Sequence, residues 1–424
     1  MARVLVTALG TGRLISKSHD PADARPSRKY DSATYVIKDG ESSAEYTTTF
    51  IAEALIKHFA IERVYVVGTA KSMWEELYDT FSGDDRDDDY YLELGRMIDD
   101  SRYDHYPYDR GYLKKVEAAL DKKLGCVGSG CYLIQYGLDR EELLSNFTIL
   151  MQIGEQLQPG DELYVDITHS FRSLSIFQYM MTSFIENLSD RDIKIAKILY
   201  GMLDIVREMG GKAPVVDLTL INELNHWIKG IYELEQYGNG YLVADLLKEQ
   251  KSELAASIED LSDRINMNFL KDIRNEHRRK LWKGLKNVDG PDSVAVSAIE
   301  RSLKKFNNDQ PEAYFQLNLT LWFFEQKRYA AGYITLTEAI ITKLCEGKII
   351  NINSWKERQK IVKAFINKEY DDSYGLVELY KKVNQIRRLV AHSQGGSEDQ
   401  YRSAVANCIK YCDQAKRAFQ QMDG

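Results

Sequence analysis

The chain has 424 residues, 28% of them charged and 44% hydrophobic, which is typical of a globular protein with two or three domains. Its formal net charge of -8 excludes a surface that is basic throughout, but not a local basic groove. The apolar runs are too short to span a bilayer, and Met-Ala-Arg leads directly into strand-like Val4, so we expect no signal peptide. The five cysteines lack zinc-site spacing, so we expect reduced thiols and no structural metal.

Short apolar segments alternate with helical patterns in the first half of the chain. The segments with strand character are residues 4–8, 34–37, 63–67, 131–134, 162–166 and 197–200. Residues 38–41 read as a hairpin turn, residues 48–59 have helical periodicity, and the acidic cluster at 83–89 reads as a solvated loop. This alternation predicts a parallel or mixed sheet with helices on both faces.

The second half of the chain reads as almost wholly helical. Strand signals fade after Leu220, and long periodic segments cover residues 242–265 and 314–347. Pro291 and Pro311 lie in loop-like segments that separate helices. We therefore expect an α/β domain at residues 1–220, a helical linker at residues 221–300 and a helical domain at residues 301–424.

Three loops that follow predicted strands contain small, hydroxyl and basic residues. An open α/β sheet binds ligands outside the carboxyl ends of its strands, and such residues suit a phosphate or a base. The candidate ligand-binding residues are Gly10, Thr11, Gly12, Thr69, Lys71, Ser72, Thr168, His169 and Ser170. The third glycine of a dinucleotide fingerprint is replaced by Ile15, and no phosphate-binding Gly-Lys-Ser/Thr motif is present. For His169 the alternative is a structural residue that fixes its own loop.

One of these loops carries a family resemblance. Asp166-Ile-Thr-His-Ser-Phe-Arg-Ser resembles the Asp-x-Thr-His-Gly signature of one branch of CRISPR-associated proteins that contain a CARF domain, although Ser170 stands where the signature has glycine. The likeness covers most of residues 1–220, including the Ala-Leu-Gly-Thr loop at 8–11 and Thr-Thr-Phe at 48–50. CARF domains dimerise and bind cyclic oligoadenylate across a two-fold axis. The resemblance therefore implies a homodimer activated by cyclic tetra- or hexa-adenylate.

Some members of this branch slowly cleave the ring that activates them. The resemblance implies that Thr11, Ser72 or His169 would perform such a step here by placing the 2′-hydroxyl of the ligand.

A second motif lies on a predicted helix near residue 390. The stripe of Leu376, Leu379, Val383, Ile386 and Val390 carries Arg387-Arg-Leu-Val-Ala-His392, and Gly395-Gly396 follows as a stop signal. About one Arg-x4–6-His match is expected by chance in such a chain, and Arg13 with His19 is another.

Its position late in the helical half of the chain, after the sensor-like domain, favours Arg387 with His392 over Arg13 with His19. This part of the chain resembles the HEPN ribonuclease domain over roughly residues 300–424. The resemblance implies that Arg387 and His392 are catalytic. Arg388 occupies a place where many members have a polar residue such as Asn, and Asn384 is the candidate substitute.

These resemblances together imply a cytoplasmic, prokaryotic, metal-independent endoribonuclease of type III CRISPR defence that cleaves single-stranded RNA. His392 would shuttle protons while the 2′-hydroxyl attacks its neighbouring phosphate, and Arg387 would stabilise the charge that develops there. The products would be a 2′,3′-cyclic phosphate and a 5′-hydroxyl. Five positions on a helix rotate by about 140°, so Arg387 and His392 do not share a face, and a dimer or a distorted last turn is needed to join them.

Three alternatives use the same sequence differently. A transcriptional regulator would need a basic recognition helix, and a metal-dependent DNA nuclease would need a strand-borne acidic cluster; neither is evident in residues 220–424. In a non-catalytic helical adaptor, Arg387 and His392 would be solvated helix residues. The basic cluster at 274–280 either lines an RNA path or belongs to a solvated helix.

Overall fold

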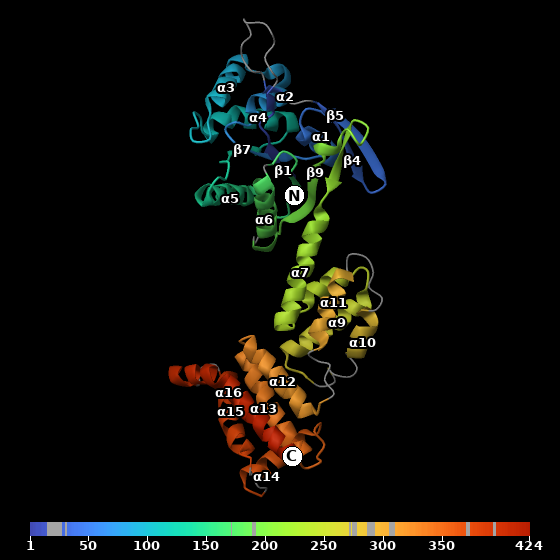
Figure 1. Ribbon diagram of the computed structural model, residues 1–424, viewed down its shortest axis with the longest axis vertical. Helices are drawn as coiled ribbons and strands as arrows, with labels where there is room; N and C mark the ends of the chain where they lie inside the picture. The colour runs from blue at the N-terminus through green and yellow to red at the C-terminus, as the bar shows by residue number, and fades with distance from the viewer. Residues whose placement is uncertain are drawn as a thin grey trace. The chain divides into compact units, whose positions relative to one another are not determined.

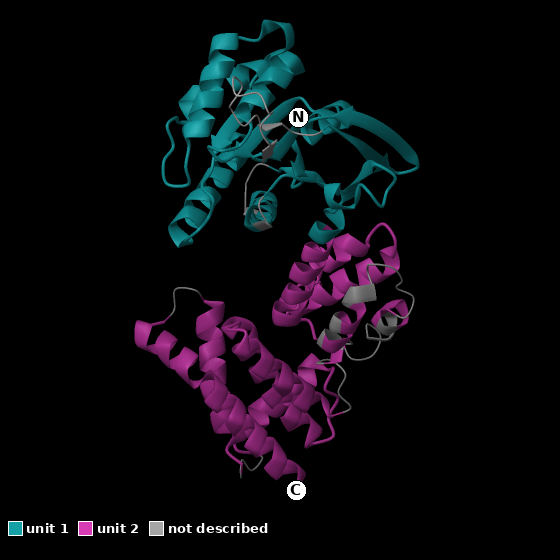
Figure 2. Ribbon diagram, turned by 45° about the horizontal axis from the view of Figure 1, so that its top comes forward, with its two compact units in different colours: residues 1–222 teal, residues 223–424 magenta. Residues whose placement is uncertain are grey.

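In the computed structural model the chain divides into two compact units, residues 1–222 and 223–424 (Figure 2). The structure describes residues 1–14, 28–29, 32–170, 172–188, 192–270, 273, 278–285, 293–304, 310–369, 374–392 and 396–424. His19, Phe171, Pro291, Gly395 and residues 274–277 of the basic cluster therefore lie outside the described residues. None of the described helices combines the length and the apolarity that crossing a membrane requires.

The first unit is built on an eight-stranded mixed sheet with the order β5-β4-β10-β9-β8-β1-β6-β7 (Figure 1). Its strands are β1 (Arg3–Leu9), β4 (Ala33–Asp39), β5 (Ser42–Thr48), β6 (Arg63–Gly68), β7 (Gly130–Leu133), β8 (Glu162–Asp166), β9 (Lys194–Gly201) and β10 (Lys212–Asp217). A separate ladder joins β2 (Arg13–Leu14) to β3 (Arg28–Lys29). Strands β7, β6, β1, β8 and β9 run parallel, so their carboxyl ends meet at one edge of the sheet.

Helices cover both faces of this sheet, as the alternation of side chains along β1 requires. Leu5 and Leu9 enter one core, whereas Val4 and Val6 enter the other. The helices of the first core are α1 (Ile51–Phe59), α2 (Trp74–Ser82), α3 (Asp88–Asp100) and α4 (Lys114–Leu124), and those of the second are α5 (Arg140–Gln156) and α6 (Arg172–Leu188). Short 3-10 turns occupy Gly83–Asp85, Arg110–Leu113 and Leu203–Ile205. The predicted mixed α/β sheet with helices on both faces is confirmed.

Two local predictions for this unit need correction. The helical pattern at 48–59 becomes helical only at Ile51, because Thr48 is the last residue of β5 and its hydroxyl donates to Glu53 Oε2 at 2.5 Å. The acidic cluster at 83–89 is not a plain loop, because it forms a 3-10 turn and then the start of α3. There Asp87 caps the helix by accepting a hydrogen bond from the Tyr90 N–H at 3.1 Å.

The second unit is helical throughout its described residues. Helix α7 (Thr219–Tyr237) begins in the first unit and continues into the second. It is followed by α8 (Tyr241–Leu247), α9 (Ser252–Asn266), α10 (Arg278–Leu285), α11 (Ser293–Lys304), α12 (Glu312–Glu325), α13 (Tyr329–Glu346), α14 (Trp355–Ile366), α15 (Leu376–Ala391) and α16 (Glu398–Asp423). The two long predicted segments are each divided in two, the second by a turn at Lys327 with a φ of 57°.

Two hydrophobic cores share α12 in this unit. Phe315, Leu319 and Phe323 pack with α7 to α11, whereas Leu317 and Phe324 pack with α13 to α16. A helix that is apolar on all sides is stable only when it is covered on all sides. The partition at residue 300 stays a prediction, and α12 ties the two parts of the unit together.

Candidate functional site

A buried carboxylate organises the loop that follows β8. Asp166 is fully buried and accepts hydrogen bonds from the Thr7 hydroxyl at 2.6 Å, the Thr168 N–H at 3.0 Å and the Thr168 hydroxyl at 2.5 Å. The Thr168 hydroxyl also accepts the Gly201 N–H at 2.8 Å. The loop that carries His169 is therefore attached to β1, β8 and β9 at once.

The loops after β1 and β6 are joined by a second buried hydroxyl. The Ser72 Oγ atom donates to the Leu9 carbonyl at 2.7 Å and accepts the Thr69 N–H at 2.9 Å. The Met73 N–H donates to the Gly10 carbonyl at 3.1 Å. Thr69 and Ser72 are each only 1% exposed; the Ser72 hydroxyl holds the two loops together, and the Thr69 hydroxyl accepts the Lys71 N–H at 3.3 Å within its own loop.

Gly12 is fixed by both conformation and space. Its φ is 68°, and a Cβ atom built there would lie 2.1 Å from the Met73 Sδ atom. Met73 itself is fully buried, so it cannot move aside cheaply. The backbone of the β1 loop consequently lies directly against the β6 loop.

The remaining ligand-binding candidates differ in what their side chains do. Lys71 extends away to donate to the Asp99 carbonyl at 2.9 Å, and Ser170 donates to Gln178 Oε1. Thr11 is partly exposed at the same sheet edge. Burial lowers the pKa of the His169 imidazole, and nearby Asp166 opposes that effect, so the ring is held neutral at pH 7.

The structure adds a fourth loop to this edge of the sheet. The Ile134 N–H donates to the Gly68 carbonyl at 2.9 Å, which places the loop after β7 beside the loop after β6. Asn146 holds this loop through its amide, with bonds of 2.8 Å to both the N–H and the carbonyl of Gln135. Sequence reasoning missed this loop because it contains no phosphate-binding pattern. The available signal was strand β7 itself, because a strand parallel to β6 places the loop that follows it at the same edge of the sheet.

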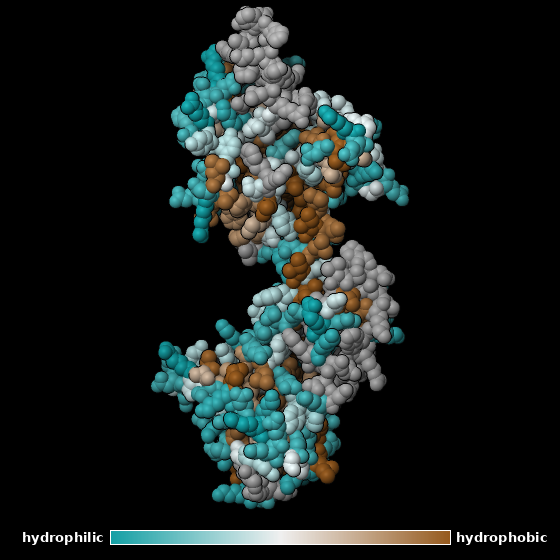
Figure 3. All heavy atoms as spheres, in the orientation of Figure 1, coloured by the Kyte–Doolittle hydropathy of each residue, from teal (hydrophilic) through white to brown (hydrophobic). Residues whose placement is uncertain are grey.

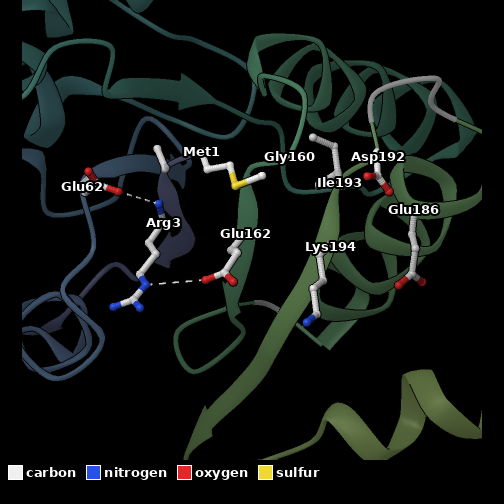
Figure 4. A pocket seen from close by; sticks show the side chains of 10 residues that line it. Met1, Arg3, Glu62, Gly160, Glu162, Glu186, Asp192, Ile193 and Lys194 are labelled. Carbon is white, nitrogen blue, oxygen red and sulfur yellow. Dashed lines mark hydrogen bonds and ion pairs between the residues drawn. The ribbon is translucent and has the colours of Figure 1, made fainter.

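A cavity of about 620 Å³ lies at the opposite, amino edge of the sheet (Figure 4). The Arg3 backbone N–H donates to a Glu62 carboxylate oxygen at 3.0 Å, and the Arg3 guanidinium forms an ion pair with Glu162 at 3.5 Å. The lining carries carboxylates at Glu62, Glu162, Glu186 and Asp192 but basic side chains only at Arg3 and Lys194. This balance disfavours a polyanionic ligand, so the carboxyl edge remains the better candidate.

The second motif lies at the end of α15. Val383 is buried in the core, whereas Arg387, Arg388 and His392 are exposed. Helix α15 ends at Ala391, so His392 is the capping residue, with a φ of −117° and its N–H bonded to the Arg388 carbonyl at 3.1 Å. The helix therefore ends before the Gly395-Gly396 pair that the sequence offered as a stop signal.

Helix geometry separates the two arginines. Four positions rotate by about 40°, so Asn384 and Arg388 lie along one side of α15, and His392 follows as the residue after the helix end. Arg387 lies about 100° from Arg388, on the side of buried Val383. A single copy thus places Asn384 and Arg388 on one side of α15 and Arg387 on another.

Tyr380 is a neighbour that sequence reasoning missed. Burial raises the pKa of its phenol, and the positive charges of Arg388 and Arg387 oppose this rise. Within the described residues, no hydrogen bond or ion pair engages the side chains of Arg387, Arg388 or His392. The position of Tyr380, one turn before Asn384, was the signal that could have revealed it.

Helix α15 is basic although the chain is acidic. It contains the basic residues Lys381, Lys382, Arg387 and Arg388, and its only acidic residue is Glu378. In the described parts of the chain, no group of three or more His, Cys, Asp or Glu side chains is arranged to hold a metal ion.

Comparisons with known proteins identify the class of the first unit. Residues 5–204 match the family model of the CARF domain of CRISPR system endoribonuclease Csx1. Residues 223–312 match the model of the second domain of CRISPR-associated protein MJ1674. The predicted CARF-type domain is confirmed, whereas the Asp-x-Thr-His-Gly branch and the HEPN domain stay predictions.

A curated relative covers most of the chain. CRISPR-associated protein MJ1674 of Methanocaldococcus jannaschii is 34% identical over 409 residues, which cover 93% of this chain and 62% of that protein. The chain thus spans less than two thirds of this relative. Among solved structures, Enterococcus italicus Csm6 bound to cyclic hexa-2'-fluoro-hexa-dAMP is 12% identical with a TM-score of 0.36, covering 100% of this chain and 94% of that chain.

Proposed function

We propose that this chain is a ribonuclease that cyclic oligoadenylate activates in type III CRISPR defence. The first unit would bind the ring, and the α15 motif would cut single-stranded RNA. The observation that carries the proposal is the combination of a CARF-type domain at residues 5–204 with Arg388 and His392 at the end of a basic helix. Csx1, whose CARF model matches residues 5–204, is named as an endoribonuclease.

The sensor would use backbone groups more than hydroxyls. The side chains of Thr69, Ser72 and Thr168 already make hydrogen bonds within the protein. The N–H groups around Gly10 to Gly12 and the loop at His169 remain at the carboxyl edge, where adenylate phosphates and bases would bind. A neutral His169 would offer a nitrogen to a base or a ribose hydroxyl without adding charge.

The effector chemistry needs one acid–base group and one cation. His392 would take the proton of the attacking 2′-hydroxyl as the new P–O2′ bond forms. The P–O5′ bond would then break, and the imidazolium would return a proton to the leaving 5′-oxygen. Arg388, which lies on the last turn of α15 before His392, would stabilise the phosphorane, and Asn384 would orient it. Arg387 would act on the same RNA from the second copy of the chain.

A homodimer is part of this proposal. Helix α6 exposes Ile176 by 63%, Met180 by 51% and Phe184 by 40%, and it has no charged residue between Arg172 and Glu186 (Figure 3). An apolar helix face of this kind is stable when a partner covers it. Because α6 begins directly after the His169 loop, a second copy on this face would bring two such loops to one axis.

A decisive experiment is cleavage of labelled single-stranded RNA in EDTA, with and without cyclic tetra- and hexa-adenylate. We expect cleavage that requires one of the rings, survives EDTA and falls at least about 100-fold in His392→Ala. Arg388→Ala should lose as much, whereas Arg402→Ala is the matched control, because Arg402 is exposed and pairs with Glu398 at 3.0 Å.

Each other outcome points elsewhere. Ring binding without RNA cleavage would favour a transcriptional regulator or an adaptor. Cleavage that persists in both His392→Ala and Arg388→Ala would remove the α15 motif from the active site. Cleavage lost in EDTA would contradict the metal-independent mechanism.

A further inference from the structure

Helix α7 has two apolar faces. One face enters the core of the second unit, where Trp227 and Leu234 are only 5% and 4% exposed. The other is open, with Ile221 exposed by 45%, Ile228 by 66% and Tyr232 by 57%. Helices at the surface of a globular protein normally turn a polar face to water, so the second apolar face of α7 needs an explanation.

The exposed residues form a straight stripe. Relative to Ile228, the positions of Ile221, Leu224 and Tyr232 lie within about 40° on the helix. Trp227 and Leu234 lie about 100° to 120° away, so the stripe is separate from the face that enters the core. Brown, apolar side chains follow α7 in Figure 3. We call Ile221, Leu224, Ile228 and Tyr232 the α7 seam.

The residues of the α7 seam are spaced like the residues through which two helices pair in a coiled coil. Ile221 and Ile228 occupy the first position of two successive heptads and Leu224 the fourth position of the first heptad, whereas Ile231, at the fourth position of the second, packs against the core of the second unit. β-Branched residues at the first position of the heptad and Leu at the fourth favour parallel, two-stranded pairing. The flanking positions Leu220 and Asn225 are uncharged, so two identical seams meet without repulsion between like charges.

The place where α7 begins connects the seam to the exposed face of α6. The Asn222 amide donates to Glu186 Oε2 at 3.0 Å, two residues beyond Phe184. The seam is only about two heptads long, which is too short to pair alone in water. A dimer that already covers α6 would hold two copies of α7 at a high local concentration.

We propose that α7 pairs in parallel with α7 of a second copy of this chain through the α7 seam. The pairing rests on the homodimer of the proposed function and extends it. Because α7 is one helix with residues in both units, the pair would join the dimer contact of the first unit to the core that α7 enters in the second. A change in the spacing or rotation of the two helices is the two-state element that such regulation requires.

Disulfide cross-linking of the full chain tests the pairing. Cys126 is the partly exposed native cysteine and is replaced by Ser, while the other four cysteines are buried. Single cysteines are then introduced as Ile221→Cys or Ile228→Cys, and as Glu233→Cys for a matched control that is exposed on the same helix about 140° away. Oxidation should give at least about fivefold more covalent dimer at the two seam positions than at the control.

A second variant measures the same contact without cysteines. Ile228→Asp places two carboxylates opposite each other and should raise the dimer dissociation constant at least about tenfold in sedimentation equilibrium. Glu233→Lys should leave it unchanged. All of these positions are exposed, so the variants leave the core of the unit intact.

The pairing is overturned if cross-linking at Glu233→Cys equals that at Ile228→Cys, if neither seam position cross-links in a dimer, or if the chain is monomeric. None of these readouts depends on RNA cleavage. A chain that cross-links through the seam but never cuts RNA would thus keep the paired helix and refute the ribonuclease.

Discussion

Replacing Ser72 by Ala should destabilise the first unit before it affects any contact with a ligand. The Ser72 hydroxyl is 1% exposed and bonds the Leu9 carbonyl at 2.7 Å and the Thr69 N–H at 2.9 Å. Removing it leaves one acceptor and one donor buried without this partner, at a cost of about 1–3 kcal/mol each. We expect the free energy of unfolding of the first unit to fall by about 2–4 kcal/mol.

Urea unfolding of the full chain, followed by circular dichroism, measures this loss. With a slope of about 2–3 kcal/mol per molar urea, the midpoint of the transition of the first unit should fall by about 1 M. Ser145→Ala is the matched control, because Ser145 lies exposed on α5 and should leave the midpoint unchanged.

The opposite result would identify a hydroxyl that contacts the ring. If Ser72→Ala weakens cyclic oligoadenylate binding while the urea midpoint stays constant, Ser72 belongs to the ligand site and our positioning role is wrong. If the binding affinity and the urea midpoint fall together, binding should recover at low temperature without denaturant, because the loops remain formed under those conditions.

Further predictions concern a glycine, an ion pair and a titration. Gly68→Ala should cost at least about 2 kcal/mol in urea unfolding, because its Cβ would lie 2.8 Å from a buried ring, whereas Gly40→Ala, in open space at a φ of 60°, should cost about 1 kcal/mol. Asp423→Ala should cost about 1–3 kcal/mol, because it removes the 2.5 Å ion-pair partner of nearly buried Lys343; no loss would show that Lys343 finds water instead. Burial lowers the pKa of His169 below its unfolded value of about 6.5, so the unfolded chain binds more protons than the folded chain. The free energy of unfolding should therefore fall as the pH drops from about 6.5 through the folded pKa. His169→Gln should flatten this dependence on pH.

The order of elements was predictable because it depends on local period. Strand segments with apolar residues on both faces, such as 63–67 and 162–166, can only be central strands of a covered sheet. Helix ends were less predictable. Thr48, the last residue of a strand, bonds the Glu53 side chain, and a left-handed turn at Lys327 divides one periodic segment into α12 and α13. Neither feature changes the hydrophobic period, so neither could be read from it.

Local pattern alone placed the candidate residues along the chain: small and hydroxyl residues after the strands, and Arg387, Arg388 and His392 at the end of one helical segment. Their roles toward a ligand or RNA stay predictions, whereas the tertiary structure decided which partners the buried ones have within the protein. Ser72 bonds Leu9 across 63 positions and Asp166 bonds Thr7 across 159, so the Ser72 hydroxyl, which the sequence offered as a ligand contact, also fastens two loops to each other. The reason is that local pattern specifies the direction of the backbone, whereas the partner of a buried donor depends on which distant strands are neighbours in the sheet.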